Sequence, residues 1–242
     1  AYVINYYSYL QNSRQQSLYH DKNWRSGMTL NDNNTDNLFS QTGDLDYFAG
    51  EKQVPSGKNF QTYTSRARVW NWLLEQILPK EEAGSIQGDK SILSHYIGEA
   101  YFFRALAYYQ ALVRYGDFPI IDEVLPDDQA ILKELSQRAP RNEVARFILK
   151  DLDTAISRLK DQGFQNNQRI NKQTAQLLKS RVALFEATFE KYHKGTGRVP
   201  GDDTWPGKDM EYNQGKTFDI AGEINFFLTE AMSAAKAVAG QI

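Results

Sequence analysis

The chain contains no cysteine, which excludes a disulfide framework, a thiolate metal site and a cysteine nucleophile. Histidine is scarce too, because His20, His95 and His193 are the only three and lie too far apart in sequence to predict a metal-binding set. The net charge is only -2, with acidic and basic residues interspersed, so the charge does not indicate nucleic acid or an anionic membrane surface as a partner. A long apolar run of the kind that crosses a membrane is also missing.

Metal-binding and catalytic motifs are equally hard to find. The segment that contains Asp32, Asn34 and Asp36 has the spacing of an EF-hand, but Asn37 stands where the loop needs glycine and Gly43 where it needs glutamate. We therefore expect no metal, no cofactor and no enzyme.

Paired carboxylates for glycoside hydrolysis stay open, because two acids that meet in space need not be close in sequence. The candidates are Asp44, Asp46, Asp202 and Asp203. All four lie in segments typical of turns, where an aspartate usually serves the turn itself.

What the chain does contain is a long stretch in which apolar residues recur at helical spacing, residues 92–115, and this predicts the central helix of the fold. Gly98 is the one glycine in it, and it contains no proline. At 100° per residue it presents two stripes. One is large (Ile97, Tyr101, Tyr108, Leu112, Tyr115) and the other mostly small (Leu93, Ala100, Phe103, Ala107, Ala111). Two apolar stripes indicate a helix packed between others. The helix is expected to end at Gly116, and Pro119 should keep the residues before it extended.

Arg104 lies in the middle of that apolar arc. A guanidinium there is costly unless a carboxylate meets it. We therefore predict a buried structural ion pair for Arg104, in preference to a ligand-binding role.

Further helices are predicted on both sides. Residues 1–20 and 62–79 have helical periodicity, and Pro79 and Gly84 end the second. Residues 141–161 and 171–193 are amphipathic, with Asn142 and Asn171 as expected N-caps. A last helix begins near Asp219. Helix pairs about 40 to 50 residues apart favour an all-α, tetratricopeptide-like α-solenoid with long irregular loops at about 21–60 and 195–217.

Three blocks of sequence carry a resemblance to a known family. They are GEAYFFRALAYYQALVRYGDFPII (98–121), RNEVARFILKDLDTAISRLK (141–160) and TAQLLKSRVALFEATFEKYHKG (174–195). In this order and spacing the blocks, about a third of the chain, resemble the SusD/RagB family of outer-membrane glycan-capture lipoproteins.

The resemblance implies a fold of degenerate tetratricopeptide pairs and a non-catalytic role in nutrient uptake. It implies an oligosaccharide ligand, a TonB-dependent SusC-like transporter as partner, and a cell-surface position at the outer membrane through a lipid anchor. Family members carry a secretory signal and a lipidated cysteine before the point that matches residue 1. We therefore expect residues 1–242 to form a single SusD-like domain, the N-terminal portion of a longer protein truncated at both ends.

Aromatic side chains in the loops are the candidate ligand contacts. Trp24, Tyr47, Phe48 and Trp205 lie in polar, glycine-containing segments. The apolar face of a sugar ring packs on an aromatic plane, while nearby Asn, Asp and Arg side chains bind its hydroxyls. The other interpretation of each aromatic is an anchor that holds its loop to the body of the protein. On the helix, Trp70 and Trp72 are 200° apart, so at least one should be in the core.

The preferred hypothesis is a glycan-binding protein that delivers its ligand to a transporter. A helical-repeat scaffold that binds protein segments is the alternative. A carbohydrate-active enzyme is the least favoured.

Overall fold

Five long α-helices make up most of the part that the computed structural model describes, residues 58–240 with side chains from Thr64 onward. They are α4 (Lys58–Glu82), α5 (Lys90–Tyr115), α7 (Arg141–Arg158), α8 (Lys172–His193) and α9 (Ile220–Ala239). Between them lie the short helix α6 (Gln129–Leu135) and the 3-10 turns η1 (Phe164–Asn167), η2 (Pro206–Asp209) and η3 (Glu211–Asn213).

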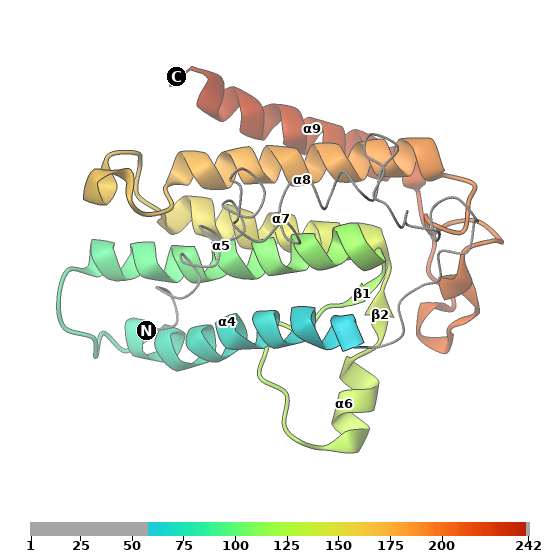
Figure 1. The fold of residues 1–242 in the computed structure, drawn as a ribbon, viewed down its shortest axis with the longest axis horizontal. Coiled ribbons are helices and arrows are strands. Elements are labelled where there is room, and N and C mark those ends of the chain that lie inside the picture. The colour runs from blue at the N-terminus through green and yellow to red at the C-terminus, as the bar shows by residue number, and fades with distance from the viewer. Residues whose placement is uncertain (1–57, 241–242) are drawn as a thin grey trace, which may run out of the picture. The chain divides into compact units, whose positions relative to one another are not determined.

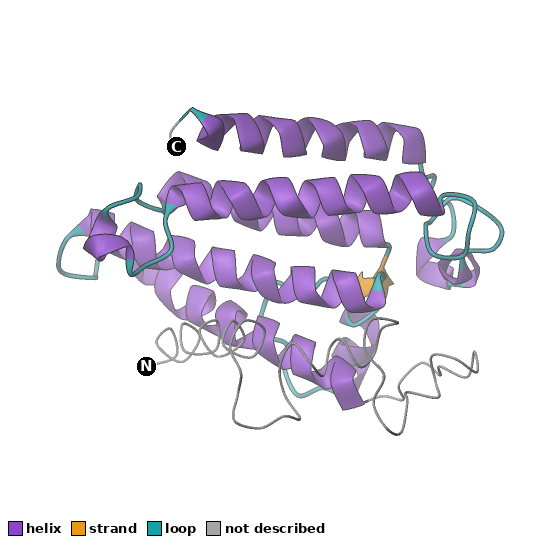
Figure 2. Cartoon of the chain, turned by 45° about the horizontal axis from the view of Figure 1, so that its top comes forward, coloured by secondary structure: helices purple, strands orange, loops and turns teal. Residues whose placement is uncertain are grey.

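The long helices form a row in which each packs on the next in sequence (Figure 1). The connection between α7 and α8 lies at one end of the helices, and the connection between α8 and α9 lies at the opposite end. Consecutive helices of this part therefore run antiparallel (Figure 2). The predicted all-α class with tetratricopeptide-like helix pairs is therefore confirmed.

The only strands in residues 58–240 are two residues long. They are β1 (Phe118–Pro119) and β2 (Arg138–Ala139), which pair antiparallel with Phe118 opposite Ala139. This short ladder closes the connection between α5 and α7, from which α6 protrudes (Figure 1). The sequence did not predict α6, and no residue of it is buried.

Helix α5 is the central core helix, as its two stripes predict. Phe103 and Ala111 on the small stripe are fully buried, and Tyr108 on the large stripe is almost so. Asp89 caps the helix start by accepting from the N–H of Ser91. Gly116 follows the last turn with φ 72°, the left-handed region in which glycine avoids a Cβ clash.

Gly98 explains how α5 and α7 approach so closely. A Cβ at this position would lie 3.0 Å from Cβ of Arg158 and 3.1 Å from Cγ of Leu159. Packing therefore favours glycine here, because any larger residue would have to push α7 or its side chains outward by a few tenths of an ångström.

Helix ends followed the sequence at some positions and not at others. Asn171 caps α8 by accepting from the N–H of Thr174, as expected. Helix α9 begins next to Asp219, also as expected, and the Asp219 side chain caps it. The expectation for Asn142 was wrong, because α7 starts at Arg141 behind Pro140 and Asn142 is buried inside it. The expected end of α4 at Pro79 was three residues too early, because the helix continues through Pro79 to Glu82 although proline cannot donate a backbone hydrogen bond there.

No helix in residues 58–240 combines the length and the apolar character that crossing a membrane requires. The tryptophans of α4 divide as their 200° separation predicts, since Trp70 is fully buried and Trp72 is 47% exposed.

Candidate functional site

Arg104 forms the buried ion pair that its position predicts. Its Nε and Nη2 atoms each donate to one carboxylate oxygen of Asp151 on α7, both at 2.7 Å. Its Nη1 donates to Oδ1 of Asn71 on α4 at 3.0 Å and to the backbone carbonyl of Asp122 at 3.2 Å. These bonds join Arg104 of α5 to both α4 and α7, and Arg104 is only 6% exposed. The role of this arginine is therefore to hold three helices together.

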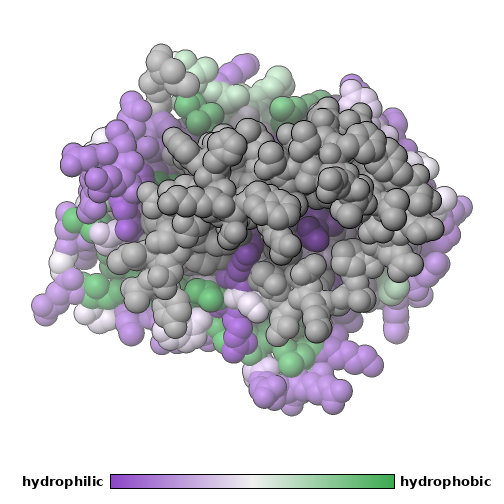
Figure 3. Space-filling view, viewed as in Figure 1, coloured by the Kyte–Doolittle hydropathy of each residue, from purple (hydrophilic) through white to green (hydrophobic). Residues whose placement is uncertain are grey.

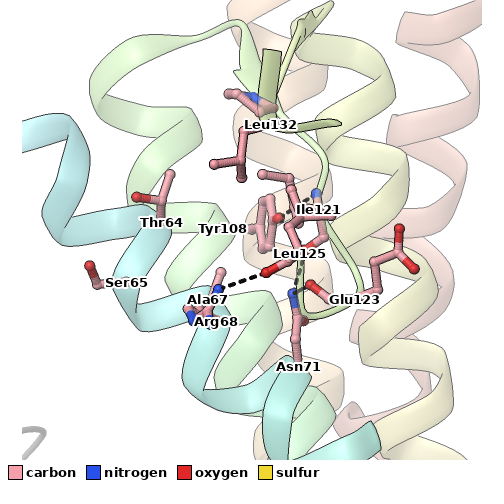
Figure 4. Close-up of a pocket in the computed structure, with 11 residues that line it drawn as sticks. Thr64, Ser65, Ala67, Arg68, Asn71, Tyr108, Ile121, Glu123, Leu125 and Leu132 are labelled. Atoms are coloured by element: carbon pink, nitrogen blue, oxygen red, sulfur yellow. Dashed lines mark hydrogen bonds between the residues drawn. The ribbon is translucent and has the colours of Figure 1, made fainter. Parts of the chain in front are cut away.

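A pocket of about 290 Å³ lies beside this network, between α4, α5 and residues 119–132 (Figure 4). We call it the α4 pocket. Its apolar wall is formed by Ala67, Tyr108, Pro119, Ile121, Leu125 and Leu132. Thr64, Ser65 and Arg68 supply polar groups from α4.

Hydrogen bonds fix the shape of the α4 pocket (Figure 4). The hydroxyl of Tyr108 donates to the carbonyl of Ile121 and accepts from its N–H, both at 2.8 Å, and burial raises the pKa of Tyr108 to about 12. The Asn71 amide donates to the carbonyls of Ile121 and Glu123, and Arg68 donates to that of Leu125. The backbone of residues 121–125 is therefore tied to α4, and the pocket is largely preformed.

Trp205 lies between η2 and the end of α5. The ring is 3% exposed, and its indole N–H donates to Oδ2 of Asp117 at 2.8 Å. Phe218 contacts it edge-on, with ring centroids 5.3 Å apart. These contacts are those of an anchor, and with so little area exposed the ring presents no open face to a sugar.

Trp205 is nevertheless among the residues that line an open hollow of about 720 Å³ within residues 201–218. Lys208 and Lys216 also line it. Both are already paired, Lys208 with Asp203 and Lys216 with Glu143.

The other predicted ligand contacts, Trp24, Tyr47 and Phe48, lie outside the described residues. They stay predictions. Within residues 58–240 no group of three or more His, Cys, Asp and Glu side chains is arranged to hold a metal ion. His95 is buried and accepts a hydrogen bond from the backbone N–H of Lys160, which is a structural role.

Comparison with known proteins identifies the family. A SusD-like family model, described as starch-binding and associating with the outer membrane, matches residues 3–184. The chain belongs to the SusD-like family.

Two relatives illustrate the match. SusD-like protein P2 of Formosa agariphila is 33% identical over 109 residues, 45% of this chain and 21% of that protein. The crystal structure of a SusD-like protein from Bacteroides fragilis is 31% identical with a TM-score of 0.45, over 56% of this chain and 25% of that one. The chain thus spans about a fifth to a quarter of the length of these relatives.

The SusD-like match includes Arg104, Asp151 and every residue of the α4 pocket, and it ends before Trp205. Sequence reasoning missed the α4 pocket, because its walls come from α4, α5, α6 and residues 119–125, and the last of these segments has no helical period. It found Arg104 but not Asp151. The signal for Asp151 was a lone carboxylate beside Leu152 on the buried face of an amphipathic helix.

Two further arginine forks hold this SusD-like row together. Arg141 of α7 donates through Nε and Nη2 to the two carboxylate oxygens of Glu186 on α8, at 2.7 and 2.8 Å. Arg169, just before α8, donates to both oxygens of Glu99 on α5. Each fork joins elements that are distant in sequence, so the forks fix how far neighbouring helices are shifted along one another.

Glu190 lies one turn beyond Glu186 and has no such partner. It is fully buried, no donor reaches either carboxylate oxygen, and the neighbouring carboxylate of Glu186 favours its protonated form. Burial raises the pKa of Glu190 to about 8, helped by the negative charges of Glu186 and Glu223, while Arg141 opposes the rise. The side chain is therefore neutral at pH 7.

Proposed function

We propose that this SusD-like chain binds oligosaccharide at the outer membrane, without breaking any bond, as part of a lipid-anchored protein that delivers it to a SusC-like TonB-dependent transporter. The observation that carries the proposal is the family match over residues 3–184, whose description names starch binding and the outer membrane. The relatives are longer, so the activity proposed is that of a whole protein to which this chain contributes.

The geometry of residues 58–240 agrees with binding more than with catalysis. The α4 pocket is preformed and mostly apolar, with the guanidinium of Arg68 at its edge. Apolar walls with a few fixed polar groups are typical of sites that recognise small ligands by shape. We propose that the loop aromatics Trp24, Tyr47 and Phe48 stack on sugar rings, and that Trp205 supports its loop by anchoring it.

Calorimetric titration with a panel of plant and host oligosaccharides tests the proposal. We expect binding to at least one glycan, with no new product when the mixture is analysed by chromatography. Released sugar would refute the non-catalytic assignment. The absence of binding to every glycan, in a chain with a cooperative thermal transition, would refute glycan binding by this chain.

Substitutions then test the contacts. Trp24→Ala should weaken binding of the identified glycan about tenfold, because one stacked aromatic is worth about 1 kcal/mol or more. Tyr192→Ala is the matched control, since this aromatic is 75% exposed on α8 and outside the loops. Equal losses in both variants would contradict the loop assignment. Arg68→Ala separately asks whether the α4 pocket contributes.

The transporter partner needs its own experiment. Co-purification of the tagged chain with the product of a neighbouring transporter gene is expected to recover the pair from outer-membrane extracts. Recovery of soluble proteins alone would favour the helical-repeat scaffold.

A further inference from the structure

Three large apolar side chains lie half-exposed on the last two helices. Leu177 and Leu184 of α8 are 51% and 50% exposed, and Met232 of α9 is 55% exposed. Hydrophobic residues are also seen along the upper edge of the surface, where α9 lies (Figure 3). Their angular positions around the two helices show whether these side chains are scattered or form one surface.

On α8, the two leucines lie next to the contact with α9. Ser180 of α8 donates to the carbonyl of Ala231 at 2.9 Å, which marks the side that faces α9. At about 100° per residue, Leu184 and Leu177 lie roughly 40° and 60° round the helix from Ser180 in the same direction. Glu186, which pairs with Arg141 of α7, lies roughly 120° the other way, so the leucines are on the side away from α7.

On α9, the apolar residues lie on the corresponding side. Arg146 of α7 packs over Phe226, with its guanidinium 3.8 Å from the ring centroid, which marks the side of α9 that faces α7. Going round the helix from Ala231, Leu228 and Met232 lie at roughly 60° and 100° in the direction opposite to that of Phe226. The exposed Leu177, Leu184 and Met232, with the partly buried Leu228, therefore line one valley away from α7, which we call the α8–α9 valley.

The α8–α9 valley is close to symmetric about its middle. Leu177 and Leu184 are three residues before and four after Ser180, and Leu228 and Met232 lie on either side of the contact at Ala231. A two-fold axis across the helices at this level would place Leu177 of one copy against Leu184 of the other. It would also place Leu228 against Met232. A patch that is complementary to itself in this way is what an isologous dimer requires.

The size of the valley agrees with a dimer. A helix of 20 residues is about 30 Å long, and two packed helices are roughly 20 Å wide, giving roughly 600 Å² per copy. About 1,200 Å² in total is at the lower end of stable protein interfaces. We propose that two copies of this chain dimerise through the α8–α9 valley, with α8 antiparallel to its counterpart and α9 antiparallel to its own.

Analytical ultracentrifugation of the full chain from 1 to 200 μM tests the association. We expect a concentration-dependent shift from the mass of one chain to that of two. Leu184→Lys should raise the dimer dissociation constant at least tenfold, because the substitution is present twice in a symmetric interface. Val113→Lys is the matched control, since Val113 is 52% exposed on α5 and should leave the constant unchanged. A wild-type chain that is monomeric at 200 μM overturns the proposal.

Disulfide trapping tests the geometry without relying on affinity, because the natural chain has no cysteine. An oxidised mixture of Leu177→Cys and Leu184→Cys chains should give a covalent dimer that contains one of each. Either variant alone should give little, because neither position faces its own copy. A dimer that crosslinks equally in all three samples, or only between identical chains, overturns the antiparallel arrangement.

Discussion

Replacing Glu190 with glutamine is expected to stabilise the protein at pH 7 and to have little effect near pH 4. Glu190 is buried against Glu186 and Glu223, and the pKa of its carboxyl in the folded protein is about 8. In the unfolded chain the pKa returns to its ordinary value of 4.5. Between these two values the folded protein holds a proton that the unfolded chain releases.

The sign and size of the effect follow from that difference. Stability falls with rising pH wherever the folded state binds more protons, so Glu190 lowers the free energy of unfolding from pH 4.5 to about 8. At about 1.4 kcal/mol per pH unit, the loss accumulated by pH 7 is about 3 kcal/mol. Glutamine cannot ionise in either state, so Glu190→Gln should recover about this amount at pH 7 and almost none of it at pH 4.

Urea unfolding followed by circular dichroism at pH 4, 5, 6 and 7 measures the difference between variant and wild type. Glu143→Gln is the control, because Glu143 pairs with Lys216 at the surface and should change stability by less than about 1 kcal/mol at every pH. A difference for Glu190→Gln that is the same at pH 4 and pH 7 would show that the burial argument is wrong.

Three further substitutions probe the contacts around α5, each by the free energy of unfolding at pH 7. Arg104→Ala should cost about 3–5 kcal/mol, because Asp151 is left buried without its partner, and adding Asp151→Leu should restore part of the loss. Gly98→Ala should cost about 1–3 kcal/mol, since the new Cβ meets a side-chain carbon of α7 at 3.0 Å; a neutral result would mean that the helices move apart freely. Tyr108→Phe should cost about 1–3 kcal/mol through the unpaired backbone groups of Ile121, and no loss would contradict the fixed shape of the α4 pocket.

Helix periodicity was enough to predict the long helices of the described part. It identified α5 as the core helix because both of its stripes are apolar, and it placed Arg104 in a buried pair because an isolated guanidinium there is too costly. It went wrong at Asn142 because the cap preference of asparagine is only a tendency, and α7 starts two residues earlier than an Asn142 cap would give, behind Pro140.

The α4 pocket is beyond what periodicity predicts. Its far wall is residues 119–132, whose path is set by long-range bonds, chiefly those of Asn71 and the hydroxyl of Tyr108 to the backbone. Trp205 shows the same limit. A tryptophan in a polar loop is equally compatible with a ligand contact and an anchor, and its bond to Asp117, 88 residues away in sequence, is invisible in the sequence.

The row of helices also determines how the protein comes apart. Helix α9 packs on α8 and is joined to α7 mainly through Arg146 and its contacts with Glu223 and Phe226, whereas α5 and α7 have neighbours on both sides. In such linear assemblies each element depends on the one beside it. Under a pulling force, the described part should therefore come apart from its two ends, with α4 separating before α9 because the contact of α4 with α5 is the least extensive in the row, and α7 should be among the last helices to separate.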